Sequence, residues 1–135
     1  IYSASGIANT LTNVTIASNS AVAGGGIYRN AGTVSLKNTM VANSTSGNNC
    51  SGTMTSQGYN LDSGNSCLFT GTGDKINTNP LLGPLQNNGG QTQTHALLAG
   101  SPAINAGTAT GAPTTDQRGV ARPQGAACDV GAVEQ

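Results

Sequence analysis

A motif that returns after 25 residues is the feature that most constrains how this sequence can fold. Residues 11–17 read LTNVTIA and residues 36–42 read LKNTMVA, so the leucine, the asparagine, the Ile/Val position and the final alanine fall in register. Residues 1–2 and 27–28 both read IY, one residue out of step, and Leu61 lies 25 positions after Leu36. Periods of 20–50 residues are typical of solenoids, propellers and repeat arrays. This unit is too short for a propeller blade and lacks the residues of a helix pair.

The composition indicates an ordered β-protein with a narrow core. Gly supplies 20 of the 135 residues, aromatic residues make up 3% and there is no Trp, so a broad hydrophobic core is not expected. Disordered chains usually carry a high net charge, whereas the net charge here is zero. Runs such as residues 11–16 and 33–36 alternate in polarity and are rich in Thr, Val and Ile, which is typical of β-strands.

These properties predict an all-β fold, a parallel β-helix (solenoid) in which residues 1–75 form about three coils. Each coil of about 25 residues holds three short strands, and inward side chains of successive coils form ladders. The predicted structural ladders are Leu11 over Leu36 over Leu61, Ile16 over Val41, and Asn13 over Asn38. Asparagine amides at a turn can bond from coil to coil, as they do in stacked cross-β structures. An antiparallel sandwich with a coincidental repeat is the alternative.

The sequence changes character near residue 76. The repeat is lost there, and all five prolines lie in residues 76–135. Proline donates no backbone hydrogen bond, so a proline-rich segment is suited to ending a ladder. We therefore expect residues 76–135 to form an irregular C-terminal capping segment of the same domain. The apolar residues expected over the open interior are Leu81, Leu82, Leu85, Leu97, Leu98 and Ile104.

The same C-terminal segment resembles a known family. Residues 79–107 read NPLLGPLQNNGGQTQTHALLAGSPAINAG, and TDQRG at 115–119, RP at 122–123 and CDVGAVE at 128–134 follow. This pattern resembles the choice-of-anchor Q domain family. The resemblance implies a large bacterial secreted or surface protein that has right-handed parallel β-helix repeats, with this segment at the end of the solenoid. Asn79 and Asn105 depart from the family pattern, which usually has Asp there.

The three cysteines indicate that the protein is exported from the cytoplasm. Cys50 and Cys67 flank residues 58–62, and a disulfide between them would close a modest loop. Spacing and context favour this pairing over the other two and over free thiols. A disulfide indicates an oxidising compartment, and Cys128 is then left over. No Cys/His cluster has metal-ligand spacing, so no metal site and no cofactor is expected.

The sequence contains no recognisable catalytic motif. The acidic residues are Asp62, Asp74, Asp116, Asp129 and Glu134, and none recurs on one face of the repeat. A glycosidase needs two carboxylates close together, and a lyase generally needs calcium ligands with a base. We interpret Asp116 with Arg118 as a structural ion pair and His95 as a hydrogen-bonded structural residue. No catalytic residue is therefore predicted.

The expected function is structural, in a protein that is secreted or lies at the cell surface. Five basic residues balance five acidic ones, which argues against nucleic acid, and no apolar run is long enough to span a membrane. Residues 1–2 already have β-type sequence and lack features that would block a first coil. Ile1 and Tyr2 are therefore the expected self-assembly end, which would pair with missing N-terminal coils or with another copy. We therefore expect a head-to-tail homopolymeric fibre or an adhesive rod. The alternatives are a lyase- or glycosidase-like enzyme, or passive binding of a surface glycan at Tyr2 and Tyr28.

Overall fold

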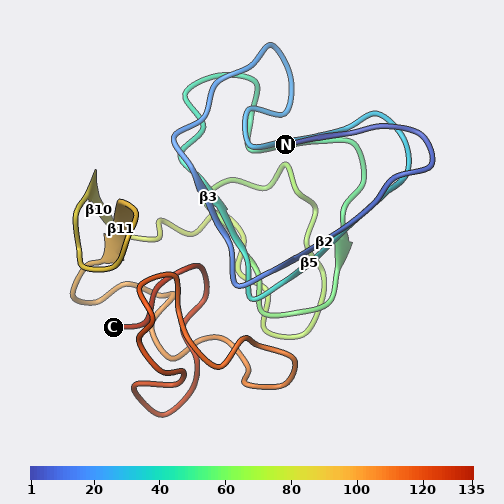
Figure 1. The fold of residues 1–135 in the computed structure, drawn as a ribbon. Coiled ribbons are helices and arrows are strands. Elements are labelled where there is room, and N and C mark those ends of the chain that lie inside the picture. The colour runs from blue at the N-terminus through green and yellow to red at the C-terminus, as the bar shows by residue number, and fades with distance from the viewer.

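The computed structural model describes all residues, 1–135, and contains eleven strands and no helix (Figure 1). The strands are β1 (Tyr2–Ser3), β2 (Ala8–Thr12), β3 (Thr15–Ala17), β4 (Ile27–Arg29), β5 (Thr33–Lys37), β6 (Met40–Ala42), β7 (Cys50–Ser51), β8 (Thr55–Ser56), β9 (Leu61–Asp62), β10 (Leu82–Gln86) and β11 (Thr94–Leu97). The first nine form three parallel sheets, ordered β1-β4-β7, β2-β5-β8 and β3-β6-β9. The protein is therefore all-β, with parallel strands stacked from one pass of the chain to the next.

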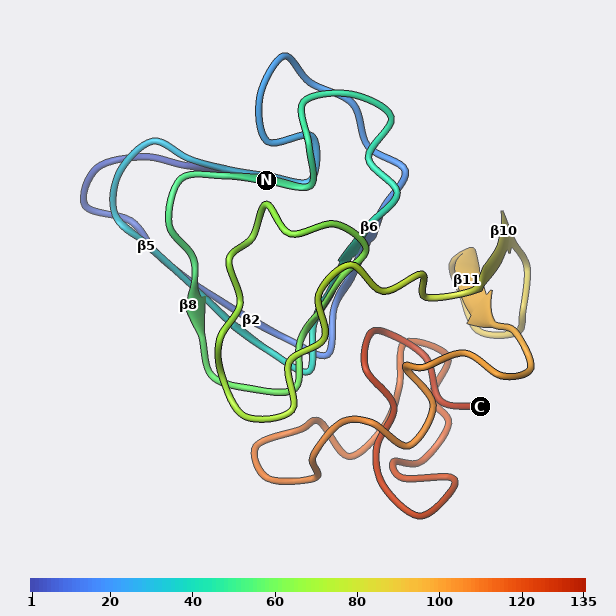
Figure 2. The same ribbon diagram turned by 180° about the vertical axis from the view of Figure 1, so that it is seen from behind.

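Each pass of the chain contributes one strand to each parallel sheet. We call these passes layers: the first holds β1, β2 and β3, the second β4, β5 and β6, and the third β7, β8 and β9. The layers trace nearly superposed three-sided outlines when viewed along the stack (Figures 1 and 2). This arrangement satisfies the backbone groups of short strands with neighbours at the ordinary inter-strand spacing.

The first two layers stand in the register that the 25-residue spacing predicts. Leu11 lies opposite Leu36 and Ile16 lies opposite Val41. Ile16, Leu36 and Val41 belong to an interior cluster that also contains Ile27 and Val34. Alternate residues of a strand point to opposite faces, so the apolar residues of the repeat fill the space that the layers enclose.

The asparagine ladder lies at the corner between the second and third strands. Asn13 and Asn38 both have positive φ, 53° and 47°, a conformation that asparagine tolerates better than most residues. Asn38 Nδ2 donates to Asn13 Oδ1 at 3.1 Å. The third layer places Tyr59, with φ 59°, at the corresponding turn. The ladder therefore has two asparagine rungs.

The third layer is shorter than predicted, so the expected rung from Leu36 to Leu61 is wrong. Leu36 lies opposite Ser56, and Leu61 lies opposite Met40. The offset between paired residues falls from 25 to 20 and 21 because the connections into β7 and from β7 to β8 contain fewer residues than their counterparts in the earlier layers. Met54 supplies an interior apolar side chain of this layer, while Leu61 shares the outer face of its sheet with Met40.

Residues 76–135 pack beside the stack rather than over its end. Leu97 and Val130 join Met40, Ala42 and Leu61 in a second hydrophobic cluster on the outer face of the β3-β6-β9 sheet. No strand of this segment pairs with a layer, since β10 and β11 form a separate antiparallel pair. Figures 1 and 2 both place this segment outside the three-sided outline.

The predicted position of the C-terminal leucines is therefore wrong. Leu81, Leu85 and Leu98 are exposed, and Leu82, Leu97 and Ile104 pack against the outer face of the β3-β6-β9 sheet. The interior is closed at the third layer by Cys67 and Phe69 instead. The outer face attracts the segment because Met40 and Ala42 would otherwise leave apolar surface in water.

Candidate functional site

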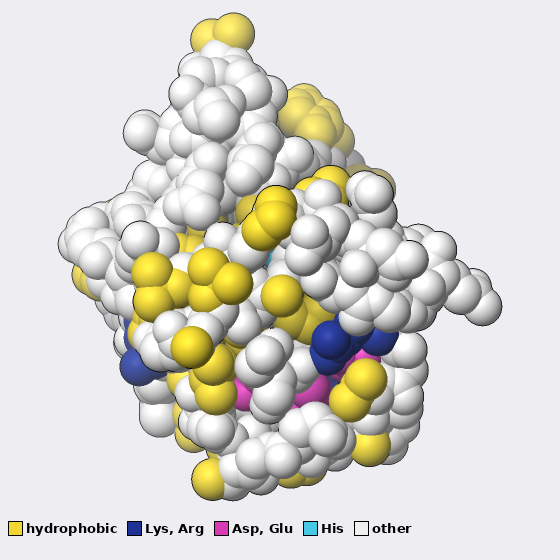
Figure 3. All heavy atoms as spheres, turned by 90° about the vertical axis from the view of Figure 1, so that its left-hand side faces the viewer, with side chains coloured by type: hydrophobic (Ala, Val, Ile, Leu, Met, Phe, Trp, Pro, Cys, Tyr) yellow, Lys and Arg dark blue, Asp and Glu magenta, His cyan; other side chains and the backbone are white.

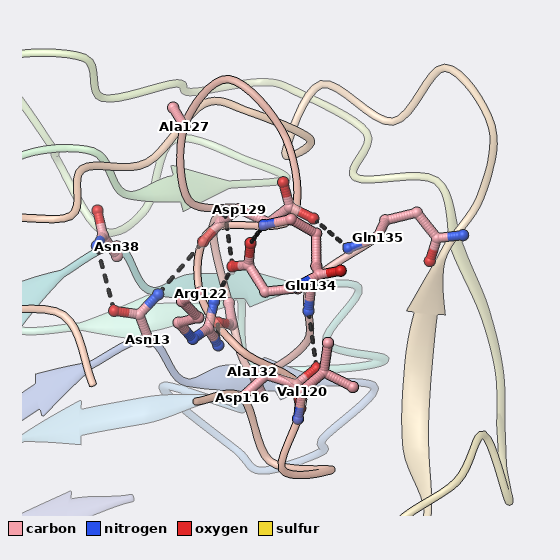
Figure 4. Close-up of polar contacts among 12 residues, drawn as sticks. Asn13, Asn38, Asp116, Val120, Arg122, Ala127, Asp129, Ala132, Glu134 and Gln135 are labelled. Atoms are coloured by element: carbon pink, nitrogen blue, oxygen red, sulfur yellow. Dashed lines mark hydrogen bonds and ion pairs between the residues drawn. The ribbon is translucent and has the colours of Figure 1, made fainter. Parts of the chain in front are cut away.

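The C-terminal segment buries three carboxylates, those of Asp116, Asp129 and Glu134, near Arg122 (Figure 4). Asp116 Oδ2 accepts two bonds from Arg118, at 2.9 Å from Nε and 2.8 Å from one terminal nitrogen. Glu134 is paired with Arg122, whose side chain is only 2% exposed. Asp129 has no arginine partner and accepts backbone N–H bonds from Asn105 and Gln135, both at 2.7 Å.

Every side-chain carboxylate oxygen in the chain accepts a hydrogen bond from the chain itself. The five acidic residues have two oxygens each, and all ten are occupied in this way. Within the layers, Asp62 accepts from Asn49, Gly64 and Cys67, and Asp74 accepts from Ser56, Asn60 and Gly71. The donors are mainly backbone N–H groups, whose positions the fold fixes. This pattern is that of carboxylates that organise turns.

Two of the buried carboxyl groups are shifted in opposite directions. Burial favours the neutral form of Asp116, but hydrogen bonds from the backbone of Glu134 and from Arg118 outweigh it and lower its pKa below the ordinary 3.8. Burial raises the pKa of Asp129, and bonds from Asn105 and Gln135 only partly oppose this. The two groups differ because Asp116 accepts more hydrogen bonds, from the backbone of Glu134 and Val120 and from Arg118, whereas the Glu134 carboxylate raises the pKa of Asp129 further.

These shifts predict a non-monotonic dependence of stability on pH. The raised pKa of Asp129 means that the folded state binds a proton first, so stability should rise as the pH falls from that pKa towards 3.8. The lowered pKa of Asp116 contributes stability that is present above 3.8 and lost as the pH falls through its folded pKa. Urea unfolding over a pH series measures both effects. Asp129→Asn should remove the rise but keep the acid loss, and a wild-type stability that falls steadily from neutral pH would contradict the assignment.

The first layer forms an open edge that carries no charged side chain. β1, β2 and β3 each pair on one side only, with β4, β5 and β6. Residues 1–28 contain no Asp, Glu, Lys, Arg, His or Pro. On the face in Figure 3, the charged side chains lie in the lower half. The edge therefore lacks the charges and prolines with which proteins usually block further strand pairing.

Ile1 and Tyr2 lie at this edge, beside an apolar groove. Ile1 is 47% and Tyr2 63% exposed. The Tyr2 ring stacks on the Tyr28 ring with centroids 5.6 Å apart and planes at 10°. The groove has a volume of about 560 Å³, and its other wall is the loop of residues 20–25. Val22, at the tip of that loop, is fully exposed.

The predicted disulfide between Cys50 and Cys67 is confirmed. Both cysteines are buried in the interior cluster with Phe69. Cys128 is a buried free thiol, and burial together with the nearby Glu134 carboxylate raises its pKa. A buried thiol of raised pKa has little thiolate at neutral pH and is therefore unreactive.

Sequence reasoning missed the ion pair between Arg122 and Glu134 and the turn that Asp129 organises. The available signal was charge density, because five of the ten charged residues lie within residues 116–134. His95 Nδ1 donates one hydrogen bond to the Gly83 carbonyl, at 2.7 Å, within the β10–β11 pair. No group of three or more His, Cys, Asp or Glu side chains is arranged to hold a metal ion.

Comparison with protein-family models, with curated proteins and with solved structures found no match. No helix in the structure has the length and apolar character that crossing a membrane requires. The candidate sites are therefore defined by their geometry alone. They are the open edge at Ile1 and Tyr2, which has no charged side chain, and the carboxylate cluster within the C-terminal segment.

Proposed function

We propose that this chain is a structural unit of an extracellular rod, a right-handed parallel β-helix that lengthens by strand addition at its first layer. The observation that carries the proposal is the open edge of β1, β2 and β3, which contains neither charge nor proline. Natural edges that must stay unpaired are blunted by lysine, proline or bulges. An edge without these features is suited to accept another layer.

The third layer supports a head-to-tail form of the rod. β7 and β8 pair on one side only, with β4 and β5, and only β9 is extended, by a bridge between Leu61 and Lys75. The first layer of one copy could therefore pair with the third layer of the next. Such a heterologous contact does not close on itself and gives a filament. Residues 63–75 cover part of this end, so the first layer is the more accessible edge.

The occupied carboxylates favour a structural role over a glycan-cleaving one. A catalytic acid, base or nucleophile needs a carboxylate oxygen directed at the substrate. Here all ten such oxygens are engaged by donors of the chain, and the buried Arg122–Glu134 pair holds turns of the C-terminal segment together. The disulfide is compatible with an oxidising, extracellular environment. The resemblance of residues 79–134 to the choice-of-anchor Q family points to the same setting.

Sedimentation velocity and electron microscopy of the oxidised full chain test the proposal. The wild type should form filaments at micromolar concentration. Leu11→Lys should abolish them, because Leu11 is partly buried at the open edge and strand addition would bury the new ammonium group. Its circular dichroism should match that of the wild type, since the free edge leaves the lysine access to water.

Gln91→Lys is the matched control, since it adds the same charge at an exposed site outside the layers. It should leave filaments intact. A wild type that remains a single small species, or filaments that persist in Leu11→Lys, would contradict growth at the first layer.

A further inference from the structure

A second cleft, made only of small polar residues, lies on the side of the second and third layers. Its volume is about 410 Å³, within the usual range of small-molecule sites. None of its lining residues is hydrophobic or charged: Asn43, Ser44, Asn48, Asn49, Ser63, Gly64, Asn65 and Ser66. One wall is the connection from β6 to β7, and the other is the turn that follows β9. The cleft is separate from the apolar groove at Tyr2 and Tyr28.

Several polar groups that line the cleft are unused within the chain. The carboxamides of Asn43, Asn48 and Asn65 are exposed and bond to no other group of the protein. The Ser63 hydroxyl accepts from Asn43 N at 2.9 Å, and the Ser66 hydroxyl accepts from Cys50 N at 3.0 Å. Neither hydroxyl donates its own proton within the chain. Three free amides and two free hydroxyl donors therefore surround one space.

The floor of the cleft is fixed before any ligand arrives. Asn49 is buried, and its Nδ2 contacts the Val41 carbonyl at 3.1 Å and Asp62 Oδ1 at 2.6 Å. Its Oδ1 accepts from Ser44 N at 3.0 Å. The disulfide joins Cys50, beside one wall, to Cys67, beside the other. A rigid site loses less conformational entropy when it binds a ligand.

We propose that this cleft binds a neutral saccharide. A carboxamide presents a donor and an acceptor side by side, and adjacent sugar hydroxyls offer the complementary pair. The absence of charge in the lining gives no attraction for an ionic ligand and no ion-pair partner to desolvate. The absence of an aromatic platform limits affinity, so the dissociation constant should be on the order of 1–10 mM for a single sugar unit.

Titration of the oxidised full chain, followed through backbone amide chemical shifts, tests the site. The probes are glucose, galactose, N-acetylglucosamine and chitotriose, with galacturonic acid as the charged comparison. At least one neutral probe should give saturable shifts confined to residues 43–49 and 63–66. Asn65→Ala should weaken that binding about tenfold, the loss expected when one hydrogen bond is removed. Asn48→Gly should act in the same direction, since glycine keeps the positive φ of residue 48 without strain.

Asn30→Ala is the matched control, because Asn30 is also exposed, has no side-chain hydrogen bond and lies outside the cleft. It should leave the dissociation constant unchanged. The proposal is overturned if no neutral probe shifts the cleft amides, or if Asn30→Ala weakens binding as much as Asn65→Ala. Binding lost on Tyr28→Ala but kept in Asn65→Ala would place the sugar in the apolar groove and overturn it as well.

Discussion

Replacement of Glu134 by glutamine should destabilise the protein by about 3–5 kcal/mol, the usual effect of removing one partner of a buried ion pair. Arg122 is 2% exposed, so its guanidinium would keep a full charge with no carboxylate to compensate it. The change also disturbs two further hydrogen bonds, because Glu134 accepts from the backbone N–H donors of Gln124 and Asp129. Urea unfolding followed by circular dichroism measures the loss.

A double-mutant cycle separates the buried charge from the lost packing. Arg122→Met alone should also be destabilising, because it leaves the Glu134 carboxylate buried without its cation. Arg122→Met combined with Glu134→Gln removes both charges, so the double variant should lose clearly less than the sum of the two single losses. Additive losses, or a single-variant loss below about 1 kcal/mol, would show that the pair does not hold the segment.

The sequence revealed the stacked layers because the first two layers match in length from their second strand through their third. Leu11 and Leu36 occupy the same place in their layers, so a fixed offset of 25 brings them together. The third layer has shorter connections, and the offset no longer identifies partners: Leu61 matches Leu36 in spacing but faces Met40 in space. A hydrophobic pattern indicates the face of the sheet on which a side chain lies. It does not indicate how much shorter one loop is than the corresponding loop of the layer before.

The position of the C-terminal segment could not be predicted from the sequence, for a different reason. Its prolines correctly indicated that no ladder continues there, but the surface that it covers depends on the outward residues of another element. Residues 40–42 read Met-Val-Ala and are buried on both faces, whereas the polar Thr15 occupies the place of Met40 in the first layer. Consecutive apolar residues are typical of a strand covered on both sides, and this pattern indicated that another segment covers β6.

The open edge and the polar cleft differ in whether they could be predicted from the sequence. Ile1 and Tyr2 could be identified as an open edge, because the chain around them lacks charge and proline over a long stretch. The polar cleft could not, because it is assembled from two connections whose approach depends on the shortened third layer. Asn and Ser are common throughout this chain, so their presence in residues 43–49 and 63–66 carries no signal until the fold brings them together.

Replacement of both Cys50 and Cys67 by alanine should cost about 3 kcal/mol, the loop-closure estimate for a separation of this size, and its effect should be local. The bond anchors the segment that brings Phe69 into the interior cluster. Hydrogen exchange should therefore accelerate at Tyr59 and Lys75, whose N–H groups bond to Thr72 and Asn60 across the third layer.

Cys128→Ala is the matched control, since it removes a buried sulfur that is not cross-linked and should cost about 1 kcal/mol through lost packing alone. The amide of Val130, which bonds to the Ala103 carbonyl beside the stack, should keep its protection in the double variant. Equal loss of protection at Val130 and Lys75 would mean that the two hydrophobic clusters unfold as one unit. That outcome would contradict a local role for the disulfide, because the cross-link touches only the interior cluster.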